Sequence, residues 1–212
     1  MFHPATPVAC YTEKNHRRDM TIMAATEPIR DKKQLKAMGN YFLKQGRFRN
    51  YLMLIMATYT ALRISDLLRL QWDDVYDETL GSFRTHMTIT EKKTGKQKTI
   101  ALNKQVTKAL RLCHPYRRSA FLFANNRKDG KAISRVQAWR IIRKAAIELG
   151  IAGKISCHSL RKTWGYHAWT SRAVSPVVIM HIYNHSSYEV TKRYLGVAQD
   201  DLDKAYLGMT LF

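Results

Sequence analysis

Apolar residues recur every three or four positions along most of the chain, the spacing that buries one face of a helix. Two of these stretches carry clear end signals: Asp31 and Ser156 are good N-caps, and Gly46 is a good terminator. The pattern therefore predicts helices over about 31–45, 48–59, from 63, 104–114, 134–149, from 157, 176–183, around 194 and 200–206.

One stretch departs from this spacing, because from Phe83 the apolar and polar residues alternate. RTHMTIT alternates, EKKTGK is a polar turn around Gly95, and QKTIAL alternates again. Alternation on both sides of a glycine-containing turn is typical of a β-hairpin, here with basic residues at its tip. The predicted fold class is therefore α+β, mainly α-helical, with one small antiparallel sheet.

The composition is strongly basic: 36 lysines and arginines against 16 acidic residues give a formal charge of +20. A polyanion would relieve the self-repulsion of such a chain, so nucleic acid is the expected partner. A basic structural protein of the ribosomal kind is the alternative that charge alone leaves open. With 45% hydrophobic residues, four Trp and eleven Tyr, a disordered basic tail is disfavoured, whereas residues 1–27 lack periodicity and are expected to form a flexible arm.

The cysteines and the apolar runs indicate in which compartment the protein is expected. Cys10, Cys113 and Cys157 are far apart and form no Cys-x-x-Cys pair, which suits a reducing cytoplasm and disfavours a zinc site or disulfide framework. The start has no signal-peptide pattern, and the longest apolar run, 51–62, is too short to span a bilayer. A cytoplasmic protein without a membrane partner is expected.

Candidate chemistry gathers in residues 157–194. On the helix that Ser156 caps, His158 and Arg161 are three positions apart and point to the same side. An imidazole beside a guanidinium makes a phosphate site at which one group can move a proton. Tyr194 could attack a phosphorus atom brought there, although Tyr183 and Tyr188 are close in sequence and stay open as alternatives.

Further cations precede this segment. Arg63 stands at the head of the apolar stretch TALRISDLLRL, and Asp66, three residues on, is the expected partner of its guanidinium. Either the pair is structural, or Asp66 holds Arg63 toward a bound phosphate. The hairpin carries four lysines, one of which could protonate a leaving oxygen while the others contact DNA phosphates or solvent. They are Lys92, Lys93, Lys96 and Lys98.

No cofactor is expected. The sequence has no Walker-type glycine loop and no His-Glu-x-x-His. Asp200, Asp201 and Asp203 resemble a metal-binding run, but they open a predicted helix, where carboxylates favour the dipole. Neither ATP nor a metal ion is therefore predicted.

Taken in order, these residues resemble those of the tyrosine site-specific recombinases, the phage-integrase family, from about residue 60 to the C-terminus. TALRISDLLRL is similar to the first-arginine helix of the family, and TEKKTGKQKTIAL to its lysine hairpin, in which the lysine before Thr-Gly, here Lys93, is catalytic. The resemblance implies one site of six catalytic residues with Asp66 in support: Arg63, Lys93, His158, Arg161, His185 and Tyr194.

The resemblance also implies a mechanism that needs neither metal nor ATP. Tyr194 would form a 3′-phosphotyrosyl link and expel a 5′-hydroxyl, with Lys93 protonating the leaving oxygen and His158 accepting the Tyr194 proton. The two arginines would hold the non-bridging oxygens, and His185 would hydrogen-bond the phosphate. Further DNA contacts are expected from six residues: Lys92, Lys96, Lys98, Arg135, Arg140 and Lys162.

The resemblance implies that residues 28–212 form a catalytic domain and that four copies act together on two duplexes. It also implies action on prokaryotic or phage-type nucleoid DNA, and a possible DNA-bending accessory protein. Residues 200–212 are the segment expected to pack on a neighbouring subunit. Members usually carry a helical core-binding domain before the catalytic domain, and in lacking one this chain is similar to short members that invert DNA segments. The alternatives are a type IB topoisomerase, disfavoured by His158 where those enzymes commonly have lysine, and a non-catalytic DNA-binding protein.

Overall fold

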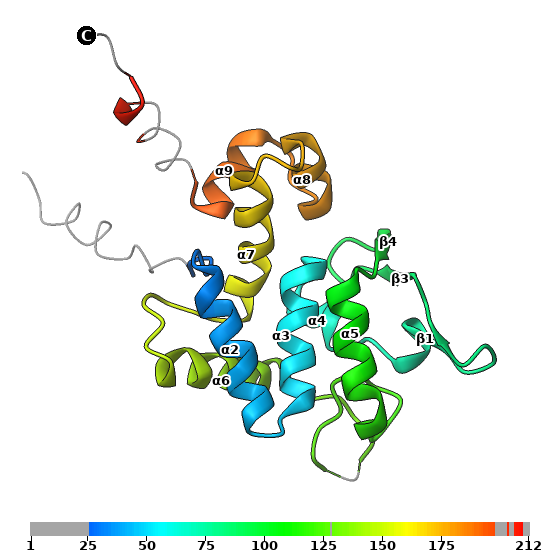
Figure 1. Ribbon diagram of the computed structural model, residues 1–212. Helices are drawn as coiled ribbons and strands as arrows, with labels where there is room; N and C mark the ends of the chain where they lie inside the picture. Colours follow the sequence, from blue (N-terminus) through cyan, green and yellow to red (C-terminus); the bar gives the residue numbers. More distant parts are fainter. Residues whose placement is uncertain (1–25, 128, 198–202, 204–205, 210–212) are drawn as a thin grey trace, which may run out of the picture.

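The computed structural model describes residues 26–127, 129–197, 203 and 206–209. Helices make up most of this part of the chain, and short antiparallel strands lie to one side (Figure 1). The α-helices are α2 (Lys32–Lys44), α3 (Phe48–Thr60), α4 (Ile64–Leu67), α5 (Lys104–Cys113), α6 (Arg135–Glu148), α7 (Cys157–Thr170), α8 (Pro176–Tyr183) and α9 (Tyr188–Leu195). Two 3₁₀ turns, η1 (Trp72–Asp74) and η2 (His114–Tyr116), and the strands β1 (Tyr76–Asp77), β2 (Ser82–Phe83), β3 (His86–Thr90) and β4 (Gln97–Ala101) complete the list.

The predicted helix ends are confirmed where a capping residue defines them. Asp31 accepts a hydrogen bond from the Lys33 amide at 2.7 Å, and Gly46 takes a positive φ of 64° just beyond α2. Ser156 caps α7 in the same way, and its side chain accepts from the His158 amide. Most of the predicted helix over 200–206 lies outside the described residues.

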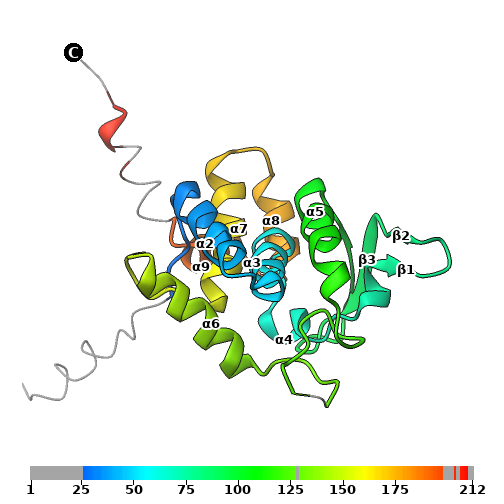
Figure 2. The ribbon, with the colours of Figure 1, turned by 60° about the horizontal axis from the view of Figure 1, so that its bottom comes forward.

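Helix α3 is the centre of the molecule, because α2, α5 and α7 all pack on it (Figures 1 and 2). Its buried face covers more than half of the circumference and includes Leu52, Met53, Leu54 and Met56, whereas Tyr59 is exposed. A helix with so wide an apolar face has to pack against several others. The packing of three helices on α3 explains the apolar run over 51–62. None of the helices in the described part of the chain is long and apolar enough to cross a membrane.

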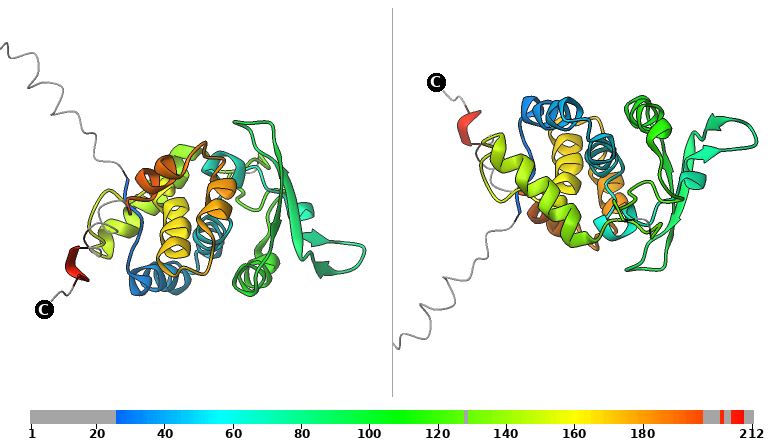
Figure 3. Two further views of the ribbon diagram at one scale, coloured as in Figure 1. Left: turned by 90° about the horizontal axis from the view of Figure 1, so that it is seen from above. Right: turned by 90° about the horizontal axis from the view of Figure 1, so that it is seen from below.

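The hairpin is confirmed, with β3 and β4 antiparallel and His86 opposite Ala101. Its inner face carries Met87 and Ile89, which are buried, and Gly95 turns the chain with a φ of 67°. The strands lie beyond α5, on one side of the helices (Figure 3). A second two-residue ladder joins β1 to β2; it was not predicted because two residues are too few to show an alternation.

The C-terminal helices α7, α8 and α9 pack into a second apolar cluster with the end of α3. Its buried members include Ala61, Tyr183 and Leu195. At its centre, Gly165 of α7 lets α8 and α9 come close, and its amide donates to Tyr183 Oη at 3.0 Å. A Cβ at this position would collide with Leu195 Cδ2 and lie 2.6 Å from Tyr183 Oη. The approach of α9 to α7 therefore requires glycine here.

Substitution Gly165→Ala is expected to destabilise the protein by about 1–3 kcal/mol, because the methyl group overfills this contact. Thermal unfolding measures the effect. Gly39→Ala in α2 is the matched control: its Cβ would meet Tyr51 at 3.4 Å, an ordinary contact, and the change should be neutral or stabilising by up to about 1 kcal/mol. Equal melting temperatures for the two variants would contradict the packing described here.

Candidate active site

Four segments of the chain approach one another around the first turns of α7: the α3–α4 junction, the hairpin, α7 itself and the α8–α9 pair. Hydrogen bonds and one ion pair connect them. Arg161 joins two of them. It is only 3% exposed, and its guanidinium donates a hydrogen bond to the carbonyl of Ala61. Ala61 has a left-handed φ of 52°, which costs free energy for a residue with a Cβ and ends α3 two residues before Arg63. The two predicted arginines are therefore brought to the same place, and the charges of both act on His158.

Tyr194 lies between the two predicted histidines. Its ring centroid is 5.2 Å from that of His158 and 4.9 Å from that of His185, with both pairs close to perpendicular. The hydroxyl is buried and has no aligned hydrogen-bond partner among the described residues. Burial raises the pKa of Tyr194, and the positive charges of Arg161 and Arg63 act in the opposite direction. A phenol held in this way needs a base and a nearby cation to become a nucleophile.

The other two tyrosines are placed differently. Tyr183 is fully buried, its hydroxyl donates to the Arg161 carbonyl at 2.6 Å and accepts from the Gly165 amide, and burial raises its pKa. The Tyr183 ring also packs against Arg161, whose guanidinium carbon lies 4.7 Å from the centroid of that ring. Tyr188 is 41% exposed and packs on Trp169. Only Tyr194, of these three, contacts both histidines.

Both histidines are neutral at pH 7. Burial, with the charges of Lys162, Arg161 and Arg63, lowers the pKa of His158 to about 4. Burial and the same two arginines lower the pKa of His185. His185 Nδ1 lies 3.1 Å from Thr191 Oγ1, and because that hydroxyl donates to the Ser187 carbonyl, Nδ1 is the donor of the pair. The free nitrogen of the neutral ring is then an acceptor.

The expected partnership of Arg63 with Asp66 is wrong. Arg63 Nη1 pairs instead with Oε1 of Glu91 at 3.0 Å, whereas Asp66 Oδ1 accepts the Lys92 amide at 2.9 Å. The prediction assumed that both residues stand on one helix, but α4 begins at Ile64 and Arg63 has the extended backbone of an N-cap. The i, i+3 relation therefore does not apply. Alternation would have revealed Glu91, since Met87 and Ile89 are the buried residues of β3 and Glu91, directly after the strand, continues the same spacing.

The hairpin lysines separate into an exposed and a half-buried group. Lys92, Lys93 and Lys96 are exposed in the turn. Lys98, which is opposite Ile89 in the ladder, donates from Nζ to the Ile182 carbonyl at 2.6 Å. Burial and the charge of Arg161 lower the pKa of Lys98 to about 8. The structure thus brings Lys98, and not Lys93, to the arginines.

Of the other residues expected to contact DNA, Lys162 is 7% exposed, and its Nζ lies 5.2 Å from the centroid of the Tyr194 ring. It belongs inside the site rather than on an exposed surface, because the helical turn that carries Arg161 directs it toward α9. Arg135 and Arg140 are exposed on α6.

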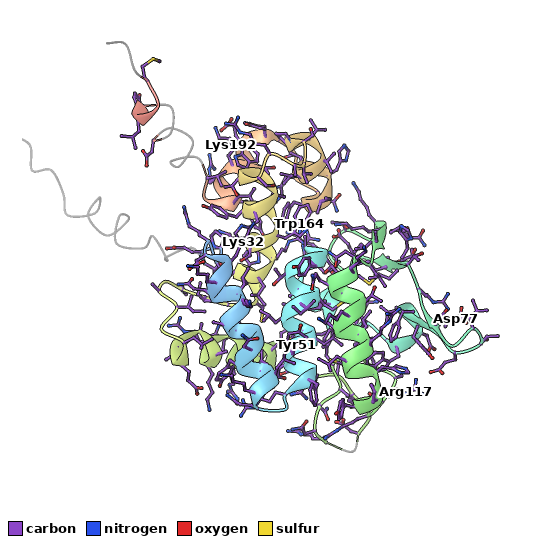
Figure 4. All side chains as sticks on the ribbon, in the orientation of Figure 1. Lys32, Tyr51, Asp77, Arg117, Trp164 and Lys192 are labelled. Carbon is purple, nitrogen blue, oxygen red and sulfur yellow. The ribbon has the colours of Figure 1, made fainter. Side chains whose placement is uncertain are left out.

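A cavity of about 540 Å³ lies elsewhere, at the start of α3, and none of the predicted residues lines it. Arg117, one of its lining residues, is far from Lys192 of α9 in Figure 4. The predicted catalytic residues lie instead toward the other end of α3, which as a 13-residue helix is about 20 Å long. The candidate site is therefore a cluster between helix ends, and it is separate from this cavity.

Comparisons with known proteins identify the family of the chain. The family model described as "Phage integrase family" matches residues 30–200. The chain is 35% identical to the "Probable integrase/recombinase YoeC" of Bacillus subtilis (strain 168), over 87% of this chain and 97% of that protein. The crystal structure of XerA recombinase superimposes with a TM-score of 0.67 at 20% identity, covering 86% of this chain and 64% of that one.

A lambda integrase tetramer bound to a Holliday junction matches with a TM-score of 0.62 at 15% identity, over 80% of this chain and 48% of that one. These two structural matches share the fold, and the family model and the Bacillus relative share the sequence along most of the chain. The chain belongs to the phage integrase family and is a site-specific tyrosine recombinase.

Proposed function

We propose that Tyr194 is the nucleophile with which this recombinase cleaves and rejoins DNA. The observation that carries the proposal is the position of its ring between His158 and His185, next to the buried Arg161. Attack of the phenolic oxygen on the scissile phosphorus forms a 3′-phosphotyrosyl link and breaks the bond to the 5′-oxygen. The phosphodiester free energy is kept in that link, so a 5′-hydroxyl from another strand can reverse the step. The proposed reaction needs no ATP and no metal ion.

Each neighbouring group has a role in this step. His158 is neutral and next to Tyr194, so it accepts the phenol proton. The guanidiniums of Arg63 and Arg161 stabilise the negative charge that grows on the non-bridging oxygens. His185 borders the ring of Tyr194 on the other side; its free acceptor nitrogen can bond the phosphate only after gaining a proton.

The leaving 5′-oxygen needs a proton, and we consider two hairpin lysines, Lys93 and Lys98, as its donor. Lys93 is exposed at the tip, where a duplex would lie, whereas the ammonium of Lys98 is directed to a protein carbonyl. We therefore assign the proton to Lys93, as the resemblance implies, and give Lys98 the role of holding the hairpin against the end of α8. Asp66 then supports the site through the Lys92 amide at the base of the same turn.

We further propose that residues 28–212 act as one catalytic domain, as four copies on two duplexes in the prokaryotic cytoplasm. The lambda integrase tetramer on a Holliday junction shares this fold and supports the assembly. The exposed cations Lys92, Lys96, Arg135 and Arg140 are proposed to contact DNA phosphates, so binding should weaken steeply as salt is raised. A DNA-bending accessory protein would join the complex where the recombination site requires it.

Replacing Tyr194 by Phe should abolish covalent attachment to DNA and leave DNA binding and the melting temperature unchanged, because only a hydroxyl is removed. The measurement uses a duplex nicked near the crossover, taken from DNA flanking the gene, incubated with protein in EDTA and run on a denaturing gel. Tyr188→Phe, an exposed tyrosine on the same helix, is the matched control and should retain the covalent band. A band that persists with Tyr194→Phe would assign the nucleophile elsewhere.

A substrate with sulfur in place of the 5′-bridging oxygen tests the proton donor, since a thiolate leaves without being protonated. Lys93→Ala should lose cleavage of the ordinary substrate by about 10²- to 10⁴-fold and regain it on the sulfur substrate. Lys98→Ala should be impaired equally on both substrates, because its role is positional. Rescue of Lys98→Ala alone would transfer the proton-donor role to that residue.

The pH dependence of cleavage follows from His158. Because the pKa of His158 is lowered, the ring is unprotonated at neutral pH and free to take the phenol proton, and it becomes protonated and unavailable as pH falls through the pKa. Bound phosphate favours the charged imidazolium, so the midpoint of the acid limb in the DNA complex should lie between about 4 and 6.5. Single-turnover cleavage against pH measures it, with DNA binding and circular dichroism as controls at each pH. A midpoint above 6.5 would contradict the assignment.

A further inference from the structure

Glu91 is a carboxylate at the end of β3 with 1% exposure, and the mechanism above does not use it. We propose that Glu91 is a positioning residue that aligns Arg63 for the scissile phosphate and joins the hairpin to the turn that carries His185. This inference rests on the proposed function, since it concerns how the phosphate site is assembled before DNA arrives.

Three segments converge on this one carboxylate. Oε1 pairs with Arg63 Nη1 at 3.0 Å, so the residue before α4 is attached to the hairpin. Oε2 accepts from Thr94 Oγ1 at 2.8 Å within the turn, and from Asn184 Nδ2 at 2.7 Å across 93 positions of sequence. Since both oxygens are occupied by side chains from different segments, moving Glu91 would release all three.

The charge of Glu91 matters as well as its shape. Burial raises the pKa of Glu91, but the Thr94 hydrogen bond and the charges of Arg63 and Lys98 lower it below its ordinary value overall. The side chain is therefore ionised at neutral pH and offsets the mutual repulsion of the cations around it. Being negative, it cannot bind the phosphate itself. It pairs with one guanidinium nitrogen of Arg63, whose side chain stays 24% exposed.

Asn184 links Glu91 to the turn next to Tyr194. It is the C-cap of α8 with a left-handed φ of 55°, a conformation that asparagine tolerates better than most residues. The next residue, His185, donates from its backbone to the Met180 carbonyl and borders the ring of Tyr194. The contact between Asn184 and Glu91 thus holds the turn on which His185 depends.

The test compares Glu91→Gln with the wild-type protein. The amide keeps the size of the side chain but presents a neutral group to Arg63. Covalent-complex formation should slow by about tenfold to a hundredfold, less than for loss of a group that touches the reacting oxygens, with duplex affinity within about threefold. Glu189→Gln, an exposed carboxylate in the first turn of α9, is the matched control and should cleave at the wild-type rate.

Two readouts separate positioning from a general loss of structure. In an Arg63→Ala background, Glu91→Gln should add little further loss, because the group through which it acts is gone. On a methylphosphonate substrate, which lacks one charged non-bridging oxygen, the deficit of Glu91→Gln should shrink. Asn184→Gly keeps the left-handed backbone and removes the side-chain amide. It should slow cleavage less than Glu91→Gln does, and the double variant should be no slower than Glu91→Gln alone.

The outcomes distinguish this inference from the proposed function. If the wild-type protein forms no Tyr194-dependent covalent complex, the proposed function fails. If it does, and Glu91→Gln cleaves at the wild-type rate, the positioning role is wrong. Glu91 would be a purely structural residue in either of two cases. In the first, the rate losses of Glu91→Gln and Arg63→Ala multiply in the double variant. In the second, the rate deficit of Glu91→Gln is unchanged on the methylphosphonate substrate and its melting temperature is lower.

Discussion

The candidate site depends on one buried guanidinium. Arg161 is almost fully removed from water, so its nitrogens need partners inside the protein, and the carbonyl of Ala61 at the end of α3 supplies one. That carbonyl is available because Ala61 adopts a left-handed conformation and the helix stops there. Beneath it, Tyr183 contacts the guanidinium with its ring and the Arg161 carbonyl with its hydroxyl. The N-terminal helices and the C-terminal α7–α9 group are thereby held together at the place where the chemistry is proposed.

Several positive charges lie around the contact between Arg161 and Ala61, and a bound anion would balance them. Arg63, Arg161 and Lys162 lie close enough to the two histidines and Tyr194 to shift their pKa values or to contact their rings. Lys98 adds a fourth positive charge, and the charges of Arg161 and Arg63 help to lower its pKa. Glu91 is the buried carboxylate that pairs directly with this group among the described residues. A DNA phosphate would add the missing negative charge, and the formal charge of +20 shows the same preference over the whole chain.

The helices and the hairpin were predictable from the sequence, and the polar contacts between them were not. Caps such as Asp31 and Ser156 and the alternation around Gly95 located most elements to within one or two residues, because these signals are local. The pairing of Arg63 with Asp66 was wrong because it assumed a helix where the backbone is extended. Lys162 was assigned to a DNA-contacting surface, although it is buried against Tyr194.

Patterns among neighbouring residues were enough to predict the fold class, the family and the residue types of the candidate site, since periodicity, capping and the His-x-x-Arg spacing are local properties. Which charged groups contact each other follows from the three-dimensional arrangement of these segments. Glu91 reaches Arg63 and Asn184 because a hairpin, a helix start and a helix end come together in space, and Lys98 reaches the Ile182 carbonyl for the same reason. Such contacts join positions dozens of residues apart, and their strength depends on burial, which no local pattern of residues records.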